Sequence, residues 1–340
     1  MIADLEELCR LNGASGDEGM VRDFIKSHIS ADKVITDNLG NLLVFKKGRK
    51  TPKNKIMYAA HMDEVGFMIT DITEDGFLRF GAVGGINSDV AVGRSMRVMS
   101  TDGEIFGVVG TKAIHQQSKD ERAKMPSFDE MYLDIGACSK AEAEKKVSRG
   151  NYAYFDAEYF EFGDGFIKGK AIDDRAGCLI MMNMINGGPE YDAWYAFTVQ
   201  EEIGTRGAKA AAFTIAPDIA IVLETTTACD IAGVSGGKKV CELGKGAVVS
   251  FMDRSTVYDK GLYTLAFDTA SANCIAVQTK TQIAGGNDSG SIHISRGGVR
   301  TCAVSVPCRY LHSPSCVIKE SDYFAVKALA EKMLSAAAEL

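Results

Sequence analysis

The chain has 340 residues, of which 46% are hydrophobic and 24% charged, an ordinary globular composition that excludes a disordered or fibrous protein. A chain of this length can bury a large core, and the length suggests two domains. The net charge of −7, without a cluster of lysine and arginine, excludes nucleic acid as a partner because a phosphate backbone would be repelled.

The first part of the chain predicts two helices followed by short strands. Apolar residues recur at helical spacing between positions 2 and 8, and Ser15 with Glu18 predicts a capping box at the start of a second helix. Turn signals and apolar runs then predict strands at residues 33–37, 38–47 and 55–60. The last of these runs reads as a buried strand that ends at His61.

Residues 68–163 have a different character. They form short β-prone pieces separated by turn signals such as EDG and TDG, which is typical of a small barrel or sandwich. Helices and buried strands alternate again afterwards, at residues 174–186, 193–199, 208–212, 218–224 and 321–340. The sequence therefore predicts an α/β fold, a mixed sheet sandwiched by helices, interrupted by a β-rich domain.

Two further observations concern the cell compartment. The N-terminal residues MIADLEELCRLNG lack the features of a signal peptide, and no apolar run is long enough to span a bilayer. We therefore expect a cytoplasmic protein without a membrane partner. Nine cysteines without CxxC spacing predict reduced, mostly buried thiols in the core.

Several polar residues fall just past the predicted carboxyl ends of strands, where open α/β sheets place their sites. They are His61, the pair Glu201 and Glu202, and Glu224. We expect the two adjacent glutamates to point in different directions, because successive side chains of a strand alternate.

Asp173 at a predicted helix start and His312 in a loop complete the set of candidates. Imidazole with carboxylate suits zinc, cobalt or manganese, and a carboxylate can bridge two ions where a neutral imidazole cannot. The sequence therefore predicts a paired-metal site that activates water.

Five motifs extend this pattern over nearly the whole chain, in the order HMDEVGF, AIDDRAGC, VQEEIGTRGA, GGNDSGSIHIS and RYLHSP. In this order they resemble the M42 metallo-aminopeptidases. The resemblance implies a zinc-peptidase-like catalytic domain, residues 1–67 with 164–340, and an inserted PDZ-like domain, residues 68–163. It also implies two divalent ions in each subunit, with zinc or cobalt preferred and manganese possible.

The resemblance assigns metal ligands to single positions. His61 and Glu224 would hold one ion, Glu202 and His312 the other, and Asp173 would bridge them. At the position of Glu224 similar proteins more often have aspartate, so the ligand here has one extra methylene group. We therefore expect altered metal spacing or preference rather than a lost site.

The remaining roles follow from the same resemblance. Glu201 would be the general base, and Asp63 would accept the proton of the His61 ring and so fix its tautomer. Asp174 would orient the peptide and side chain of the residue before it. Asp288 lies in a glycine-rich turn and is expected either to contact substrate or to cap a helix that begins at Ser289.

These assignments predict an aminopeptidase that acts on short peptides. Similar proteins assemble through the inserted domain into dimers and then a hollow dodecamer, so we expect a homo-oligomer. Three alternatives remain: a carboxypeptidase or deacylase, in which Arg175 or Arg206 would hold a substrate carboxylate; a glycoside hydrolase of the endoglucanase type, which needs only two carboxylates; and a metal-binding scaffold without catalysis.

Overall fold

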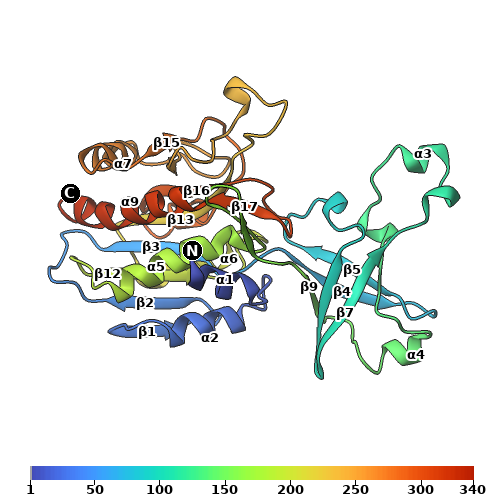
Figure 1. The fold of residues 1–340 in the computed structure, drawn as a ribbon. Helices are drawn as coiled ribbons and strands as arrows, with labels where there is room; N and C mark the ends of the chain where they lie inside the picture. The colour runs from blue at the N-terminus through green and yellow to red at the C-terminus, as the bar shows by residue number, and fades with distance from the viewer. Residues whose placement is uncertain (1) are drawn as a thin grey trace.

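The computed structural model describes residues 2–340 and contains an eight-stranded mixed sheet with a separate barrel beside it (Figure 1). In spatial order the strands of the sheet are β1 (Lys33–Thr36), β2 (Leu42–Lys46), β12 (Ala193–Thr198), β3 (Ile56–His61), β13 (Ile219–Thr227), β16 (Arg300–Cys308), β14 (Ala247–Val249) and β15 (Val277–Thr279). The central strands β12, β3, β13 and β16 run parallel, so their carboxyl ends meet at one edge.

Helices cover both faces of this sheet. One face carries α1 (Ala3–Arg10), α2 (Gly19–Ser27), α5 (Ile172–Asn186), α7 (Lys260–Ala272) and α9 (Glu320–Ala338). The other face carries α6 (Arg206–Ile215) and α8 (Ser289–Ile292), and a short 3-10 helix, η4 (Gly236–Lys238), precedes β14. The α/β architecture expected from the sequence is confirmed.

The alternation of side chains in β3 explains why the sheet needs two covers. Ile56, Tyr58 and Ala60 pack into the core under α5 and α9. Met57 and Ala59 point the opposite way, into the smaller core under α6. Because both sets are apolar, β3 is stable only as a central strand buried on both faces.

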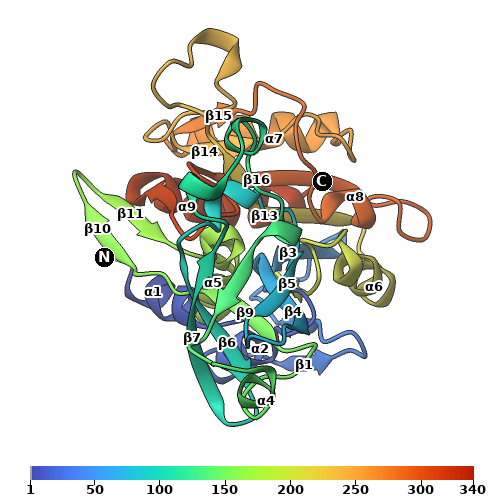
Figure 2. The same cartoon turned by 90° about the vertical axis from the view of Figure 1, so that its right-hand side faces the viewer.

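The inserted segment forms a closed, six-stranded antiparallel barrel, which faces the viewer in Figure 2. Its strands, in order around the barrel, are β4 (Gly66–Ile72), β5 (Leu78–Val83), β8 (Tyr132–Asp134), β7 (Gly103–Gly110), β6 (Ser95–Ser100) and β9 (Tyr152–Phe155). Between them lie η1 (Ser88–Val90), η2 (Ile114–Gln116), α3 (Lys119–Arg122), η3 (Phe128–Glu130) and α4 (Lys140–Ala143). The β-rich insertion is confirmed, whereas its PDZ-like character and the boundaries at 68 and 163 stay predictions.

The barrel has a core of its own. Phe67 lies at its centre, with its ring edge-on to those of Phe80 and Phe155 at centroid distances of 5.3 and 5.2 Å. A small sheet of β10 (Phe160–Phe162), β11 (Phe166–Gly169) and β17 (Cys316–Lys319) then ties the chain leaving the barrel to the C-terminal part of the main fold.

Most predicted elements agree with the structure, but the capping box is wrong. Helix α2 begins at Gly19 without a side-chain cap. The Ser15 hydroxyl instead donates to Asp63 at 2.6 Å, and the Glu18 carboxylate accepts from the backbone N–H groups of Gly16 and Gln200. Long-range partners in the folded chain have replaced the local pair.

All nine cysteines are free thiols. Six are buried, as predicted, whereas Cys229 is half-buried and Cys138 and Cys274 are exposed. Among residues 2–340, no helix is long and apolar enough to cross a membrane.

A buried ion cluster connects helix α1 to the chain after β3 and to the start of α5. Lys170 Nζ lies 2.5 Å from Glu64 Oε1, and Arg175 Nη2 lies 3.7 Å from the same oxygen. The Arg175 guanidinium also donates to the carbonyl oxygens of Leu8 and Met62. All three charged side chains are at most 4% exposed, so each depends on the others for compensation.

Removing the one negative charge of this cluster should therefore destabilise the fold. We expect Glu64→Gln to lower the free energy of unfolding by about 3–5 kcal/mol, because two buried cations lose their counter-charge. Urea unfolding followed by circular dichroism measures this. The exposed pair of Lys327 and Glu331 is the control, since Glu331→Gln should cost less than about 1 kcal/mol. Equal effects of the two changes would contradict the prediction.

Candidate metal centre

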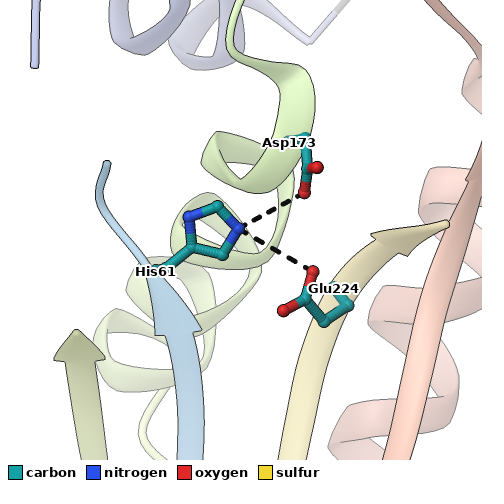
Figure 3. A group of neighbouring side chains, drawn as sticks. All are labelled: His61, Asp173 and Glu224. Atoms are coloured by element: carbon teal, nitrogen blue, oxygen red, sulfur yellow. Dashed lines mark ion pairs between the residues drawn. The ribbon is translucent and has the colours of Figure 1, made fainter. Parts of the chain in front are cut away.

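The first group of candidate ligands lies at the carboxyl edge of the sheet (Figure 3). His61 is the last residue of β3, Glu224 projects from the neighbouring β13, and Asp173 lies at the start of α5. His61 Nε2 is 3.4 Å from Asp173 Oδ1 and 3.8 Å from Glu224 Oε2. The strand β13 continues to Thr227, so Glu224 is an inward-facing strand residue rather than a strand end.

The second group shares Asp173 with the first. His312 Nε2 lies 3.6 Å from Asp173 Oδ2 and 3.3 Å from Glu202 Oε2. Within each group one possible ligand atom per residue lies within 4.8 Å of the others. The structure thus brings together all five residues that the sequence proposed as ligands, and Asp173 presents one oxygen to each group.

Asp63 lies beside the His61 ring, but its carboxylate is not the nearest acceptor of the ring proton. The closest acceptor to the His61 ring nitrogen Nδ1 is the backbone oxygen of Asp63, at 2.9 Å, whereas the carboxylate oxygen is 3.6 Å away. The Asp63 carboxylate instead accepts from the backbone N–H groups of Glu201 and Glu202 at 3.0 and 3.1 Å. Both acceptors favour a proton on Nδ1, which leaves Nε2 free to ligate.

Glu201 belongs to neither group but lines the cleft beside them. We expected Glu201 and Glu202 to point in different directions because they alternate along a strand. That reason is wrong, because β12 ends at Thr198 and Gln200 has a φ of 55°. Glu201 and Glu202 therefore lie in a turn, with both N–H groups directed at Asp63. Their side chains still separate, since only Glu202 reaches His312.

Two further aspartates are buried behind the site. Asp174 accepts a hydrogen bond from the backbone N–H of Gly177, which fixes the first turn of α5. Asp288 precedes α8, but its side chain makes no capping hydrogen bond, so the interpretation as a side-chain cap is wrong. Its carboxylate accepts from the Thr198 hydroxyl and has no exposed surface, a position that does not favour contact with substrate.

The buried carboxyl groups of the site outnumber its positively charged groups. Burial raises the pKa of Glu202 to about 7 and those of Glu201 and Glu224 well above their usual range. Burial opposes the charge on His312, but Asp173 and Glu202 raise its pKa to about 10. The carboxyl groups thus tend to keep protons and the imidazole tends to gain one, which is how a surplus of buried negative charge is relieved.

A pair of divalent cations fits these residues. The donors are imidazole and carboxylate, which suit borderline metals. The buried oxygen Oδ1 of Asp173 has no hydrogen-bond partner among the described residues, which is costly unless a ligand compensates it. Both groups open onto one cleft of about 760 Å³.

Sequence reasoning missed one part of the site. The His312 ring nitrogen Nδ1 lies 2.9 Å from the backbone oxygen of Gly85, in the inserted segment after β5. The preceding Gly84 has a φ of 93°, and a Cβ atom there would lie 2.9 Å from Val65 and 3.2 Å from Glu202. The glycine pair in GAVGGIN was the available signal, since close backbone approach needs glycine.

Comparison with known proteins agrees with this geometry. The family model described as M42 glutamyl aminopeptidase matches residues 40–329. The chain belongs to this family. It is therefore an aminopeptidase of the M42 group. The members that it resembles include a lysyl aminopeptidase of Pyrococcus furiosus, which is 33% identical over 91% of this chain and 89% of that protein. A glutamyl aminopeptidase of Lactococcus lactis is 30% identical over 94% and 91%. A protein of Acetivibrio thermocellus with a provisional aminopeptidase name is 40% identical over 96% of each.

Solved structures match over the whole fold. The aminopeptidase APDkam598 of Desulfurococcus kamchatkensis has a TM-score of 0.91 and 34% identity, covering 97% of this chain and 93% of its own. The TET1 peptidase of Pyrococcus horikoshii, which can assemble into a tetrahedron or a large octahedral shell, has a TM-score of 0.86 and 30% identity over 98% of both chains. A Thermotoga maritima structure described as an endoglucanase has a TM-score of 0.79 and 36% identity, covering 98% of this chain and 99% of its own.

Replacement of Glu224 tests its place in the first group. We expect Glu224→Ala to lower the zinc content by about one ion per chain, because His61 and Asp173 alone leave that ion with too few protein ligands. Mass spectrometry of the dialysed protein measures the stoichiometry. The exposed Glu161→Ala is the matched control and should keep the metal content of the parent. Unchanged stoichiometry in Glu224→Ala would remove this residue from the ligand set.

Proposed function

We propose that the chain uses two divalent metal ions to hydrolyse the N-terminal peptide bond of short peptides. One observation carries this proposal: two ligand groups share the carboxylate of Asp173, and the free carboxyl group of Glu201 stands beside them in the same cleft. This arrangement supplies metal ligands and a separate proton acceptor from different residues.

The proposed ligands are His61 and Glu224 for one ion, Glu202 and His312 for the other, and Asp173 for both. When bound, such ions would lower the pKa of a water molecule and polarise the scissile carbonyl group. Zinc or cobalt suits this donor set best, and manganese is acceptable to it.

Glu201 would act as the general base. Its carboxylate would take a proton from the attacking water and later give it to the amine that leaves. Burial raises the pKa of this carboxyl group, which brings it closer to the pH at which a base both accepts and releases a proton efficiently. The Asp63 carboxylate accepts a hydrogen bond from the Glu201 backbone N–H at 3.0 Å and so fixes the backbone from which the Glu201 side chain extends.

The carboxypeptidase alternative needs Arg175 or Arg206 to bind a substrate carboxylate, and neither residue is placed to do so. Arg175 has no exposed surface and does not line the cleft, so it cannot hold a substrate carboxylate. Arg206 is exposed but does not line the cleft. The glycoside hydrolase alternative leaves the convergence of His61 and His312 on carboxylates unexplained, and the endoglucanase description is that of the Thermotoga protein, not of this chain.

The inserted barrel is the proposed site of self-association into dimers and a dodecamer. It exposes several large apolar side chains, among them Phe106 (61% exposed), Ile114 (70%) and Met125 (60%). Exposed apolar groups gathered on one domain favour a protein interface. The tetrahedral assembly of the TET1 peptidase supports the same interpretation. A hollow assembly would restrict access to short peptides.

Glutamine variants of the adjacent glutamates separate their roles. Glu201→Gln should retain two metal ions while turnover of an aminoacyl p-nitroanilide falls by about 10²- to 10⁴-fold, because the amide cannot accept the proton. Glu202→Gln should lose metal, because a neutral amide is a poorer ligand than a carboxylate.

Metal analysis and turnover on the two proteins together decide the assignment. Metal that is lost from Glu201→Gln but kept in Glu202→Gln would reverse the two roles. Absence of turnover by the parent protein with zinc, cobalt and manganese in turn would contradict the proposed activity itself.

Light scattering tests the assembly. The intact protein should be several times heavier than the 36.5 kDa chain at micromolar concentration. Ile114→Asp and Met125→Asp should reduce this mass, since a buried charge opposes association. Val257→Asp, at an equally exposed position of the main fold (72% exposed), is the control. A monomeric parent protein would refute the assembly. A mass lowered only by Val257→Asp would show that the interface lies on the main fold and not on the barrel.

A further inference from the structure

The turn that carries Glu201 is held by side chains from the first part of the chain. Strand β12 ends at Thr198, and each of the next four backbone N–H groups donates to a side-chain oxygen. The acceptors are Asn41 for Val199 and Glu18 for Gln200, both at 3.0 Å, and Asp63 for Glu201 at 3.0 Å and for Glu202 at 3.1 Å. None of the three acceptors is among the described residues that line the cleft, so they hold the turn from outside it.

Gln200 is the strained residue of this turn. Its φ is 55°, in the left-handed region that a residue with a Cβ atom rarely adopts. Its N–H donates to Glu18, and its carbonyl oxygen accepts from the N–H of Arg206 at 3.0 Å. Gln200 directly precedes Glu201, so the conformation of Gln200 sets the direction in which the Glu201 side chain leaves the backbone.

Glu18 is buried although it is acidic. Its side chain is 4% exposed, and its oxygen Oε1 accepts from the N–H groups of Gly16 at 2.8 Å and Gln200 at 3.0 Å. Burial raises the pKa of Glu18 to about 7, although both N–H groups act to lower it. The contact with Gly16 is local, whereas the contact with Gln200 joins residues 182 positions apart. Only the second contact reaches the candidate centre.

The segment that carries Glu18 is itself fixed. Strand β9 of the barrel contributes two hydroxyl groups, of which that of Tyr152 donates to the Ser15 backbone oxygen at 3.1 Å and that of Tyr154 to the Asp17 carboxylate at 2.6 Å. Helix α2 begins directly after Glu18. An acceptor can impose a backbone conformation only if it is itself held in place, and Glu18 meets this condition.

We propose that Glu18 is a positioning residue for peptide hydrolysis: its carboxylate holds Gln200 in the left-handed conformation and so directs the Glu201 side chain into the cleft beside Asp173. This inference rests on the proposed function, in which Glu201 is the general base. Asp63 holds the N–H groups of Glu201 and Glu202, whereas Glu18 holds the residue before them. Glu18 does not line the cleft, so it acts on the reaction only through the turn.

Removal of the acceptor should slow turnover without removing metal. In Glu18→Ala, kcat for an aminoacyl p-nitroanilide should fall by about 10- to 100-fold, since a base displaced by about 1 Å can lose about 10²-fold in rate. KM and metal stoichiometry should remain those of the parent protein, because the lining of the cleft is unchanged and Asp63 still holds Glu202. Glu18→Gln retains an acceptor oxygen and should keep kcat within about threefold of the parent value. Metal loss from Glu18→Ala, or an equal fall of kcat in both variants, would overturn the proposal.

A matched carboxylate elsewhere separates positioning from general destabilisation. Asp322 is 1% exposed and, like Glu18, accepts from two backbone N–H groups, those of Gly244 and Gly246 at 2.6 and 2.8 Å. It does not line the cleft. Asp322→Ala should therefore lower the melting temperature about as much as Glu18→Ala while keeping the kcat of the parent. An equal loss of kcat in the two variants would show that Glu18 is only structural and would refute the inference.

Relief of the backbone strain at Gln200 is the more specific test. Glycine adopts positive φ without a steric cost, so a glycine at this position needs no acceptor to hold the conformation. Gln200→Gly alone should keep kcat near the parent value, and when added to Glu18→Ala it should restore most of the lost kcat. No recovery in the double variant would contradict the proposal, because Glu18 would then not act through the conformation of Gln200.

Hydrogen exchange provides a readout that depends neither on turnover nor on bound metal. Mass spectrometry of overlapping peptides that differ by the Gln200 amide should show this amide protected in the metal-free parent, about tenfold or more less protected in Glu18→Ala, and unchanged in Asp322→Ala. Rapid exchange of this amide in the parent would overturn the proposal even if no Glu18 variant folds. Parent kcat in Glu18→Ala refutes this inference alone, whereas absence of aminopeptidase activity from the parent, or full turnover by Glu201→Gln, refutes the proposed function.

Discussion

The candidate centre depends on one buried carboxylate, that of Asp63. Its two oxygens accept hydrogen bonds from the Ser15 hydroxyl and from the N–H groups of Glu201 and Glu202, and its backbone oxygen lies 2.9 Å from the His61 ring. Burial opposes its charge, but the contacts with His61, Ser15 and the Glu201 N–H outweigh this and lower its pKa. A single anion therefore connects the N-terminal loop, the end of β3 and the turn after β12, which supply the base and two ligands.

The inserted barrel is part of the site although its core is separate. Its first strand, β4, begins at Gly66 inside the HMDEVGF motif, and the loop after β5 brings the carbonyl oxygen of Gly85 to the His312 ring. A hydrogen bond to one ring nitrogen fixes the tautomer and raises the basicity of the other. The orientation of His312 therefore depends on where the inserted segment places Gly85.

The fold class and the ligand set could be predicted because their signals are local. A buried apolar run marks β3, and polar residues past such runs mark His61 and Glu202. The capping box of Ser15 failed because a distant aspartate offered its hydroxyl a stronger, charged acceptor. The Gly85 contact joins residues 227 positions apart, and no pattern in the sequence encodes such a distance. What escaped prediction are the contacts that exist only once the chain is folded.

Strained backbone conformations are concentrated in the loops that carry the candidate centre. Nine non-glycine residues within 2–340 have positive φ, and five of them lie in the loops that carry the centre: Ala171, Gln200, Thr205, Tyr310 and His312. Each costs on the order of 1–2 kcal/mol, which persists only if the surroundings enforce it. The enforcing elements are the strands behind each loop, since β3, β12, β13 and β16 are almost fully buried and are covered on both faces. A rigid, doubly covered sheet is thus the reason that a strained, charge-rich edge can keep one geometry.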